Sequence, residues 1–180
     1  TNMDFDVRSK EIKEWLQQEF TGIRTGQAAP ALLDSVKVES YGSMMPINQV
    51  ASIGIEDART LRVSPWDASL IKSIETAITN ADLGVSVVTD SSGLRVIFPE
   101  LTSDRRAQLQ RLAKQKHEES RVSVRAARDE AMKIIDKKEK DGDISEDEKF
   151  TQKESLQKKV DDLNEALDKI MSEKEIEISK

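Results

Sequence analysis

The last 79 residues of the chain, from Thr102 to Lys180, contain no proline and only one glycine, Gly142. Apolar residues recur there every three or four positions, which is the period of an amphipathic helix. Because proline and glycine are the strongest helix breakers, this stretch predicts two long helices that fold back on each other at Gly142. A helix from Thr102 to Asp141 would be roughly 60 Å long.

The two predicted helices carry apolar stripes of different quality. Ser145 and Glu148 form a Ser-x-x-Glu capping box, and a heptad seam follows it. The stripe of the earlier helix is thin between Lys114 and Arg121, so part of that helix is expected to stand free of packing. The seam comprises Leu156, Val160, Leu163, Leu167 and Ile170, and the earlier stripe comprises Leu109, Leu112, Val124, Met132 and Ile135.

Another helix is predicted near the N-terminus, where Gly26 weakens the helical pattern and Pro30 ends it. Three helices that each need a covered face most simply cover one another, so the seam is interpreted as bundle core. A coiled-coil scaffold that self-associates through the seam at 156–170 is the alternative. The apolar face of the N-terminal helix comprises Phe5, Ile12, Trp15, Leu16, Phe20 and Ile23.

A different pattern occupies the chain between Pro30 and Pro99. Short alternating runs predict strands at 36–39, 53–55, 60–63, 85–88 and 94–98, the last two forming a hairpin. Asp67 can cap a short helix that buries Leu70, Ile71, Ile74 and Ile78. The predicted fold class is therefore α+β with two domains. An elongated antiparallel three-helix bundle, residues 1–30 plus 102–180, carries an inserted small β/α domain, residues 31–101.

The chain passes between the two predicted domains twice. These crossings are far apart in sequence but must be close in space, and two short linkers side by side predict a hinge. A rigid joint packed by neighbouring side chains is the alternative. The predicted hinge residues are Ala29, Pro30, Ala31, Glu100, Leu101 and Thr102.

Composition argues against several classes of protein. The chain has no cysteine, one histidine, no glycine-rich phosphate loop and no apolar run near the ~20 residues of a membrane span. His117 is expected at a solvated helix position, where it offers neither a metal site nor a catalytic triad. No enzyme activity, catalytic residue, metal or cofactor is therefore expected. The N-terminus also lacks the apolar core of a signal peptide, so a soluble, cytoplasmic protein is predicted.

One predicted helix is basic within an acidic chain. Residues 102–141 carry 12 basic and 8 acidic side chains, a net of +4, although the whole chain has a net charge of −6. Lys114, Arg121, Arg125 and Arg128 follow at spacings of 7, 4 and 3, so they share one helix face. Arginine suits phosphates and guanine edges, which predicts RNA binding.

The pattern alone supports a second interpretation of this face equally well. It could be a solvated surface with i,i+4 ion pairs to Glu118 and Asp129. The interpretation as a binding face relies on small neighbours that leave the guanidinium groups accessible, namely Ser120, Ser123, Ala126 and Ala127.

Several motifs, in order along nearly the whole chain, resemble the signature of the bacterial ribosome recycling factor family. Each motif alone is weak, but together they are highly specific. They are Ile23-Arg24-Thr25-Gly26-Gln27-Ala28-Ala29-Pro30-Ala31-Leu32-Leu33-Asp34, Arg59-Thr60-Leu61-Arg62 with Pro65-Trp66-Asp67, Leu101-Thr102 with Arg105-Arg106, Arg121-Val122-Ser123-Val124-Arg125-Ala126-Ala127-Arg128 and Ile144-Ser145-Glu146-Asp147-Glu148.

The resemblance implies a fold and a function. Members of the family are L-shaped, with a three-helix arm and a β/α arm joined by a hinge. They bind the ribosome after termination and, with elongation factor G and its GTP hydrolysis, separate the subunits. The bundle rests on large-subunit RNA, the smaller domain faces the elongation factor, and the factor is a monomer and not an enzyme. Arg24, Arg125 and Arg128 match the positions implied to contact RNA.

The chain departs from the family pattern at a few positions. Gln27 stands where arginine is usual, and Asp129 stands where a second basic residue is common. Val87 and Val88 replace a stretch that is usually similar to Asn-Pro. A general single-strand RNA binder remains an alternative, although it normally needs exposed aromatics and the chain has only seven. Trp66 is the expected exposed one, while Trp15 and Phe20 are expected in the bundle core.

Overall fold

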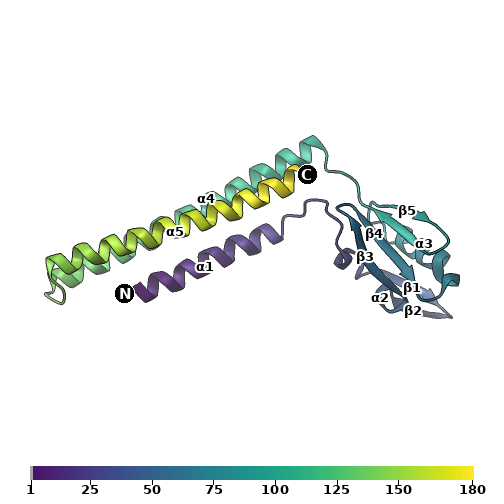
Figure 1. Ribbon diagram of the computed structural model, residues 1–180, viewed down its shortest axis with the longest axis horizontal. Helices are drawn as coiled ribbons and strands as arrows, with labels where there is room; N and C mark the ends of the chain where they lie inside the picture. Colours follow the sequence, from purple (N-terminus) through teal and green to yellow (C-terminus); the bar gives the residue numbers. More distant parts are fainter. Residues whose placement is uncertain (1) are drawn as a thin grey trace. The chain divides into compact units, whose positions relative to one another are not determined.

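The computed structural model describes residues 2–180, with side chains from residue 4 onward (Figure 1). The chain divides into two compact units. The bundle unit contains the N-terminal segment up to Thr25 together with Ser103–Lys180, and the inserted unit contains Gly26–Thr102. The fold is α+β, as the sequence predicted.

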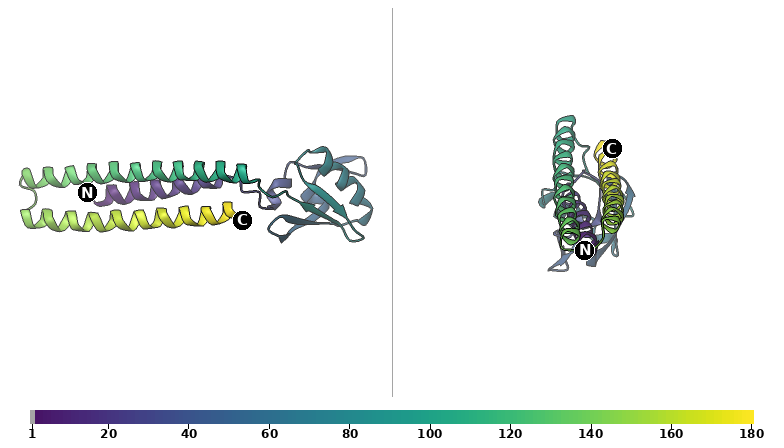
Figure 2. Two further views of the ribbon diagram at one scale, coloured as in Figure 1. Left: turned by 90° about the horizontal axis from the view of Figure 1, so that it is seen from above. Right: turned by 90° about the vertical axis from the view of Figure 1, so that its left-hand side faces the viewer.

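Three helices form the bundle unit, and Figure 2 shows them running alongside one another. Buried apolar residues of all three meet along its length, which confirms that the predicted seam is bundle core. Because one chain covers its own seam, the seam is not a free surface for a scaffold. The helices are α1 (Asn2–Thr21), α4 (Ser103–Lys140) and α5 (Glu146–Ser179).

The buried face of α4 contains more small residues than its apolar pattern predicted. Ala113, Ser120 and Ala127 recur every seven residues and are 0–2% exposed, alongside Leu109, Val124 and Ile135. Leu112, predicted in the stripe, is 38% exposed instead. The stretch between Lys114 and Arg121 is therefore packed through Ser120, and the expectation that it stands free was wrong.

The seam of α5 continues beyond the predicted stretch. Ile170 is only half-buried, because Met171 takes the next core position after Leu167. The core positions then advance by 11 residues from Leu156 to Leu167 and again to Ile178. An 11-residue repeat gives 3.67 residues per turn, slightly more than the 3.6 of a straight helix.

The turn between α4 and α5 has the predicted glycine and cap. Gly142 has a φ of +83°, and the amide of Asp143 donates to the carbonyl of Lys138 at 2.8 Å. Together with the bond from Gly142 N to Glu139 O, this is a Schellman motif. The Ser145 hydroxyl accepts from the amide of Glu148 at 3.1 Å, which caps α5.

The first helix ends earlier than predicted, at Thr21 rather than near Pro30. The amide of Ile23 turns back to the carbonyl of Phe20, a tighter bond than the helical one. Ile23 still buries its side chain, so the apolar pattern persisted after the helix had stopped. Periodicity alone could not detect this end.

The inserted unit contains two antiparallel sheets. The smaller sheet pairs β1 (Lys37–Ser40) with β2 (Ser43–Pro46), and the larger has the strand order β3-β4-β6-β5. Its strands are β3 (Ala51–Asp57), β4 (Thr60–Pro65), β5 (Ser86–Thr89) and β6 (Leu94–Ile97). The helical segments are α2 (Ile47–Val50), α3 (Ile71–Asn80) and 3-10 turns at Pro30–Leu33 and Ala68–Leu70.

This unit has its own core, and α3 supplies part of it. The Asp67 carboxylate accepts from the amide of Ser69, which is the predicted cap, and Ile74 and Ile78 are fully buried. Ile71 is only half-buried. These residues pack against buried side chains of the strands, among them Val38, Leu61, Val63, Leu94 and Val96.

The sequence pattern did not predict β2. Its burial pattern does not alternate between exposed and buried, so the period-two signal is absent. Gly42 was the one signal in the sequence for the turn that precedes β2, in which Tyr41 and Gly42 both have positive φ values, +48° and +83°. Such a pair is typical of a two-residue hairpin, which favours glycine at the second position.

The first boundary between the units lies at Thr25/Gly26 and not at Pro30/Ala31. Ala28 is buried in the core of the inserted unit, and its amide donates to the carbonyl of Ala58 at 2.8 Å. The two crossings lie side by side, because a Cβ on Gly26 would stand 3.5 Å from Leu101 Cδ2. All the predicted hinge residues thus belong to the inserted unit. Motion of one unit relative to the other remains a prediction.

Deleting Gly26–Thr102 and joining Thr25 to Ser103 through a short glycine linker is expected to leave a folded bundle. The physical reason is that each bundle helix buries its apolar face against the other two. Circular dichroism should show a cooperative helical melt for the shortened chain. A gradual, non-cooperative loss of helical signal would contradict the division into independent units.

Candidate nucleic-acid interface

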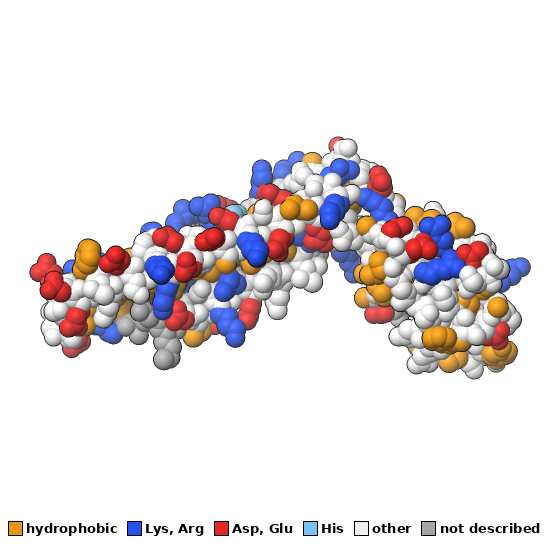
Figure 3. Space-filling view, viewed as in Figure 1, with side chains coloured by type: hydrophobic (Ala, Val, Ile, Leu, Met, Phe, Trp, Pro, Cys, Tyr) orange, Lys and Arg blue, Asp and Glu red, His pale blue; other side chains and the backbone are white. Residues whose placement is uncertain are grey.

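The four basic residues predicted to share a face do share one side of α4. Lys114, Arg121 and Arg125 are exposed, and the side chain of Arg128 is 37% exposed. From Lys114 to Arg128 the face extends about 21 Å along the helix. On the side of the molecule seen in Figure 3, basic and acidic side chains alternate along the bundle, so any positive field is local.

Two of these arginines have acidic partners on the same helix. Arg125 Nη2 lies 3.2 Å from Glu118 Oε1, and Arg128 Nη2 lies 3.2 Å from Asp129 Oδ1. Neither is the i,i+4 pair expected for a solvated face. Exposed pairs of this kind contribute little free energy, ~0–1 kcal/mol, so a phosphate can displace the carboxylate at small cost.

The remaining two cations are less constrained. Within the part of the chain that the structure describes, residues 2–180, Lys114 and Arg121 have no ion pair with a carboxylate. Of the small residues thought to flank the face, Ser123 and Ala126 are exposed, whereas Ser120 and Ala127 are buried in the core. Access to the guanidinium groups therefore depends on fewer small neighbours than the sequence suggested.

Arg24 belongs to the bundle unit but lies outside its helices. It follows the end of α1 and is exposed, while its neighbours Ile23 and Thr25 are 5% and 7% exposed. An arginine between two buried residues has a fixed backbone and a free side chain. This arrangement suits a cation that contacts a partner.

His117 does not occupy the solvated position that the sequence predicted. Its side chain is 16% exposed, and its Nε2 lies 2.9 Å from Asp168 Oδ1 on α5. His117 lies on α4 and Asp168 on α5, so this contact joins the two helices. Among residues 2–180, no group of three or more His, Cys, Asp or Glu side chains could hold a metal ion.

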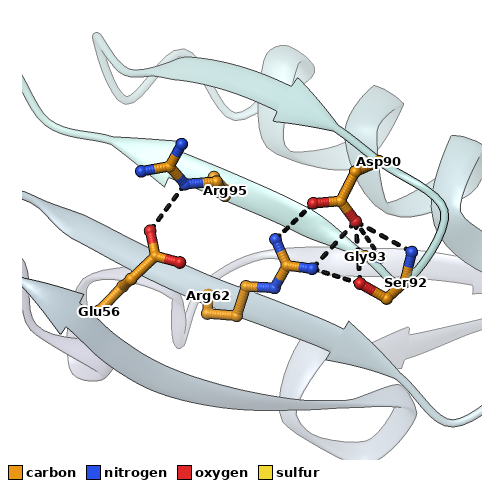
Figure 4. A network of polar contacts seen from close by, with 6 residues as sticks. All are labelled: Glu56, Arg62, Asp90, Ser92, Gly93 and Arg95. Atoms are coloured by element: carbon orange, nitrogen blue, oxygen red, sulfur yellow. Dashed lines mark hydrogen bonds and ion pairs between the residues drawn. The ribbon is translucent and has the colours of Figure 1, made fainter.

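The exposed face of the large sheet carries two arginines directly opposite each other, Arg62 and Arg95 (Figure 4). Like charges at such a position repel, so each needs a carboxylate. Arg62 forms two bonds with Asp90, 2.6 and 2.9 Å long, and Arg95 bonds to Glu56 at 2.6 Å. The Arg62 guanidinium holds the pKa of Asp90 well below its usual range. These four charges cancel, so we do not assign a polyanion site here.

Exposed aromatic residues lie in both units, and Phe150 on α5 is 71% exposed. Trp66 is 69% exposed, as the sequence suggested, and Tyr41 is 81% exposed. The Tyr41 hydroxyl donates to the carboxylate of Asp67. In the bundle, Phe20 is buried as predicted, whereas Trp15 is half-buried with Lys116 Nζ 5.9 Å from its ring centroid.

The fold and the site define a class of protein: a three-helix bundle with a basic face on one helix and an inserted β/α unit. A family model described as "Ribosome recycling factor" matches residues 16–178. The chain belongs to the ribosome recycling factor family, which confirms the resemblance, and this family consists of translation factors rather than enzymes. None of the helices in residues 2–180 is long and apolar enough to cross a membrane.

Similar proteins span nearly the whole chain. The ribosome-recycling factor of Symbiobacterium thermophilum is 43% identical over 97% of this chain and 95% of its own length. That of Rubrobacter xylanophilus is 43% identical over 97% and 94%. A solution structure of the ribosome recycling factor is similar with a TM-score of 0.62 and 36% identity, covering 98% of this chain and 94% of that one.

A second similar structure contains partners. It describes models of the T. thermophilus ribosome recycling factor and the E. coli elongation factor G bound to the E. coli post-termination complex. The matching chain has a TM-score of 0.57 and 37% identity, with coverage of 98% of this chain and 96% of that one.

Proposed function

We propose that this protein binds the post-termination ribosome and, together with elongation factor G and its GTP hydrolysis, separates the two subunits for reuse. Membership in the family supports this function, as does the similar factor described with elongation factor G on a post-termination complex. The observation that carries the proposal is the basic face on α4, which gives an acidic protein a local site for RNA. The protein acts as a monomer in the cytoplasm.

The bundle unit would supply the contact with large-subunit RNA. Arginine can donate two parallel hydrogen bonds to a phosphate or a guanine edge, and a row along one helix face can follow an RNA backbone. The carboxylates of Glu118 and Asp129 now occupy part of that donor set. They would be exchanged for RNA on binding. The proposed contact residues are Arg24, Lys114, Arg121, Arg125 and Arg128.

The inserted unit would face the elongation factor. The chain enters and leaves this unit at Thr25/Gly26 and Thr102/Ser103, and these two crossings would act as the hinge. Motion about them would let the bundle remain on RNA while the inserted unit responds to the elongation factor.

Replacing Arg128 by alanine is expected to weaken binding to purified large subunits by ~1–3 kcal/mol if the guanidinium contacts RNA. The slope of log K against log salt should also fall by ~1, because fewer counterions are released. Co-sedimentation at several salt concentrations measures both effects. Helical melts should be unchanged, since an exposed arginine contributes little to stability.

Lys133→Ala is the matched control for this variant. Lys133 is exposed on the same helix, five residues on, and turned away from the arginine face. Equal, small losses for Arg128→Ala and Lys133→Ala would show that only diffuse charge matters. If Arg128→Ala lost its cooperative helical melting transition, Arg128 would be needed for the stability of the bundle rather than for binding.

A further inference from the structure

The apolar seam of α5 is interrupted by a lysine. Lys174 lies between Met171 and Ile178 on the buried side of the helix, and its side chain is 7% exposed. Removing an ammonium group from water is expensive unless hydrogen bonds and an opposite charge compensate for the lost hydration. A lysine at a core position therefore requires hydrogen-bond partners, and these partners show which part of the chain the lysine fixes in place.

Lys174 has one partner in the segment that follows α1 and one on its own helix. Its Nζ donates to the carbonyl oxygen of Ile23 at 2.8 Å and to Glu177 Oε2 at 3.2 Å. The other carboxylate oxygen of Glu177 accepts from the Thr25 hydroxyl at 3.0 Å. The position also suits a cation, because it lies beyond the C-terminal end of α1, whose last carbonyl groups carry partial negative charge.

These bonds hold the backbone on both sides of Arg24. The carbonyl of Ile23 and the amide of Arg24 belong to one planar peptide group, so a bond to that carbonyl orients the plane that enters Arg24. On the other side, Thr25 is anchored through its hydroxyl and is 7% exposed. With both neighbours tied to α5, the Cα–Cβ direction of Arg24 is set.

We propose that Lys174, together with Glu177, is a positioning residue that orients Arg24 for its contact with large-subunit RNA. The inference rests on the proposed function, in which Arg24 contacts RNA. Lys174 itself does not touch RNA, because it is buried within the bundle unit. The chain becomes free of this clamp immediately after Thr25, which is where the inserted unit begins.

A double-mutant cycle on the full-length protein tests the clamp. Affinity for purified large subunits is measured for the wild type, Arg24→Ala, Lys174→Met and the double variant. Methionine replaces the lysine with an apolar side chain of similar length, and such replacements of buried charges are often tolerated. Lys169→Met, at an exposed position on α5, controls for the lost charge, and Thr25→Val removes the other arm of the clamp.

Arg24→Ala is expected to weaken binding roughly tenfold, as for the loss of a hydrogen-bonded charge. Lys174→Met should weaken it roughly three- to tenfold in the wild type but less than twofold when Arg24 is already alanine, because coupled residues are not additive. Thr25→Val should behave in the same way, Lys169→Met should have little effect, and amide exchange at Arg24 and Thr25 should be faster in Lys174→Met. This pattern supports a role exerted through Arg24.

Two results would overturn the inference while leaving the proposed function in place. The first is equal losses from Lys174→Met in the presence and absence of Arg24, which would mean that the lysine acts on the bundle as a whole. The second is no effect of Arg24→Ala while Arg125→Ala and Arg128→Ala still weaken binding. If no arginine variant weakens binding, the proposed RNA face fails, and the clamp has no RNA contact to position.

Discussion

Replacing Gly93 by alanine is expected to destabilise the inserted unit by about 3 kcal/mol. A Cβ at this position would lie 2.3 Å from the carbonyl oxygen of Val63, which is backbone of β4 and cannot rotate away. Moving the turn instead would disturb the bonds that Asp90 accepts from Gly93 and Arg62. Native-state hydrogen exchange of the β4 and β6 amides measures the loss.

Gly54→Ala is the matched control in the same sheet. Gly54 lies in β3 and pairs with Arg62 across the strands, and apart from the residues next to it in the chain, a Cβ there would meet no atom of residues 2–180 within 4 Å. Alanine at this position should leave stability unchanged or raise it by ~0.5 kcal/mol, because glycine in a strand loses more backbone entropy. Similar exchange rates for Gly93→Ala and the wild type would contradict the prediction, because they would show that the turn can move to make room for the Cβ without loss of stability.

Replacing Ser120 by leucine is expected to destabilise the bundle by about 3 kcal/mol. Ser120 is fully buried, and its hydroxyl already donates to the carbonyl of His117 at 2.5 Å. Leucine would have to separate α4 from its neighbours, since Ala113 and Ala127 show how little room this line of the helix has. The helical melting temperature should fall by on the order of 10 °C.

Ser123→Leu provides the comparison, because Ser123 is exposed on the same helix and leucine is a good helix former. Circular dichroism melts of the two variants should differ clearly, with Ser123→Leu close to the wild type. A similar drop for both would mean that the cost arises from the helix and not from the bundle core. Comparable stability of Ser120→Leu and the wild type would contradict close packing at Ser120.

Features with a local chemical cause could be predicted from the sequence. The turn at Gly142, the caps at Ser145 and Asp67, and the seam from Leu156 to Leu167 depend on residues close together in the chain. The buried face of α4 could not be recognised in the same way, because Ala113 and Ser120 carry no strong apolar signal. Counting only large apolar residues led to Leu112, which the structure exposes.

Partners that are distant in sequence account for the other differences. Asp168 explains the position of His117, and Ala58 explains why Ala28 joins the inserted unit. The arginine face of α4 was visible as a spacing, but its carboxylate partners were not the expected ones. Lys174 could not be recognised from the sequence, since a lysine among the many charged residues of α5 is expected to be solvated until the carbonyl of Ile23 is placed beside it.

The separation of α1 from α4 and α5 by the inserted unit has a consequence for synthesis. Translation proceeds at roughly 5–20 residues per second, so α1 leaves the ribosome long before either helix that covers it exists. The inserted unit is complete at Thr102 and can fold first, and the hairpin of α4 and α5 forms through local contacts. The packing of α1 must therefore wait until α4 and α5 have been made, and until then its apolar face with Leu16 and Phe20 stays uncovered.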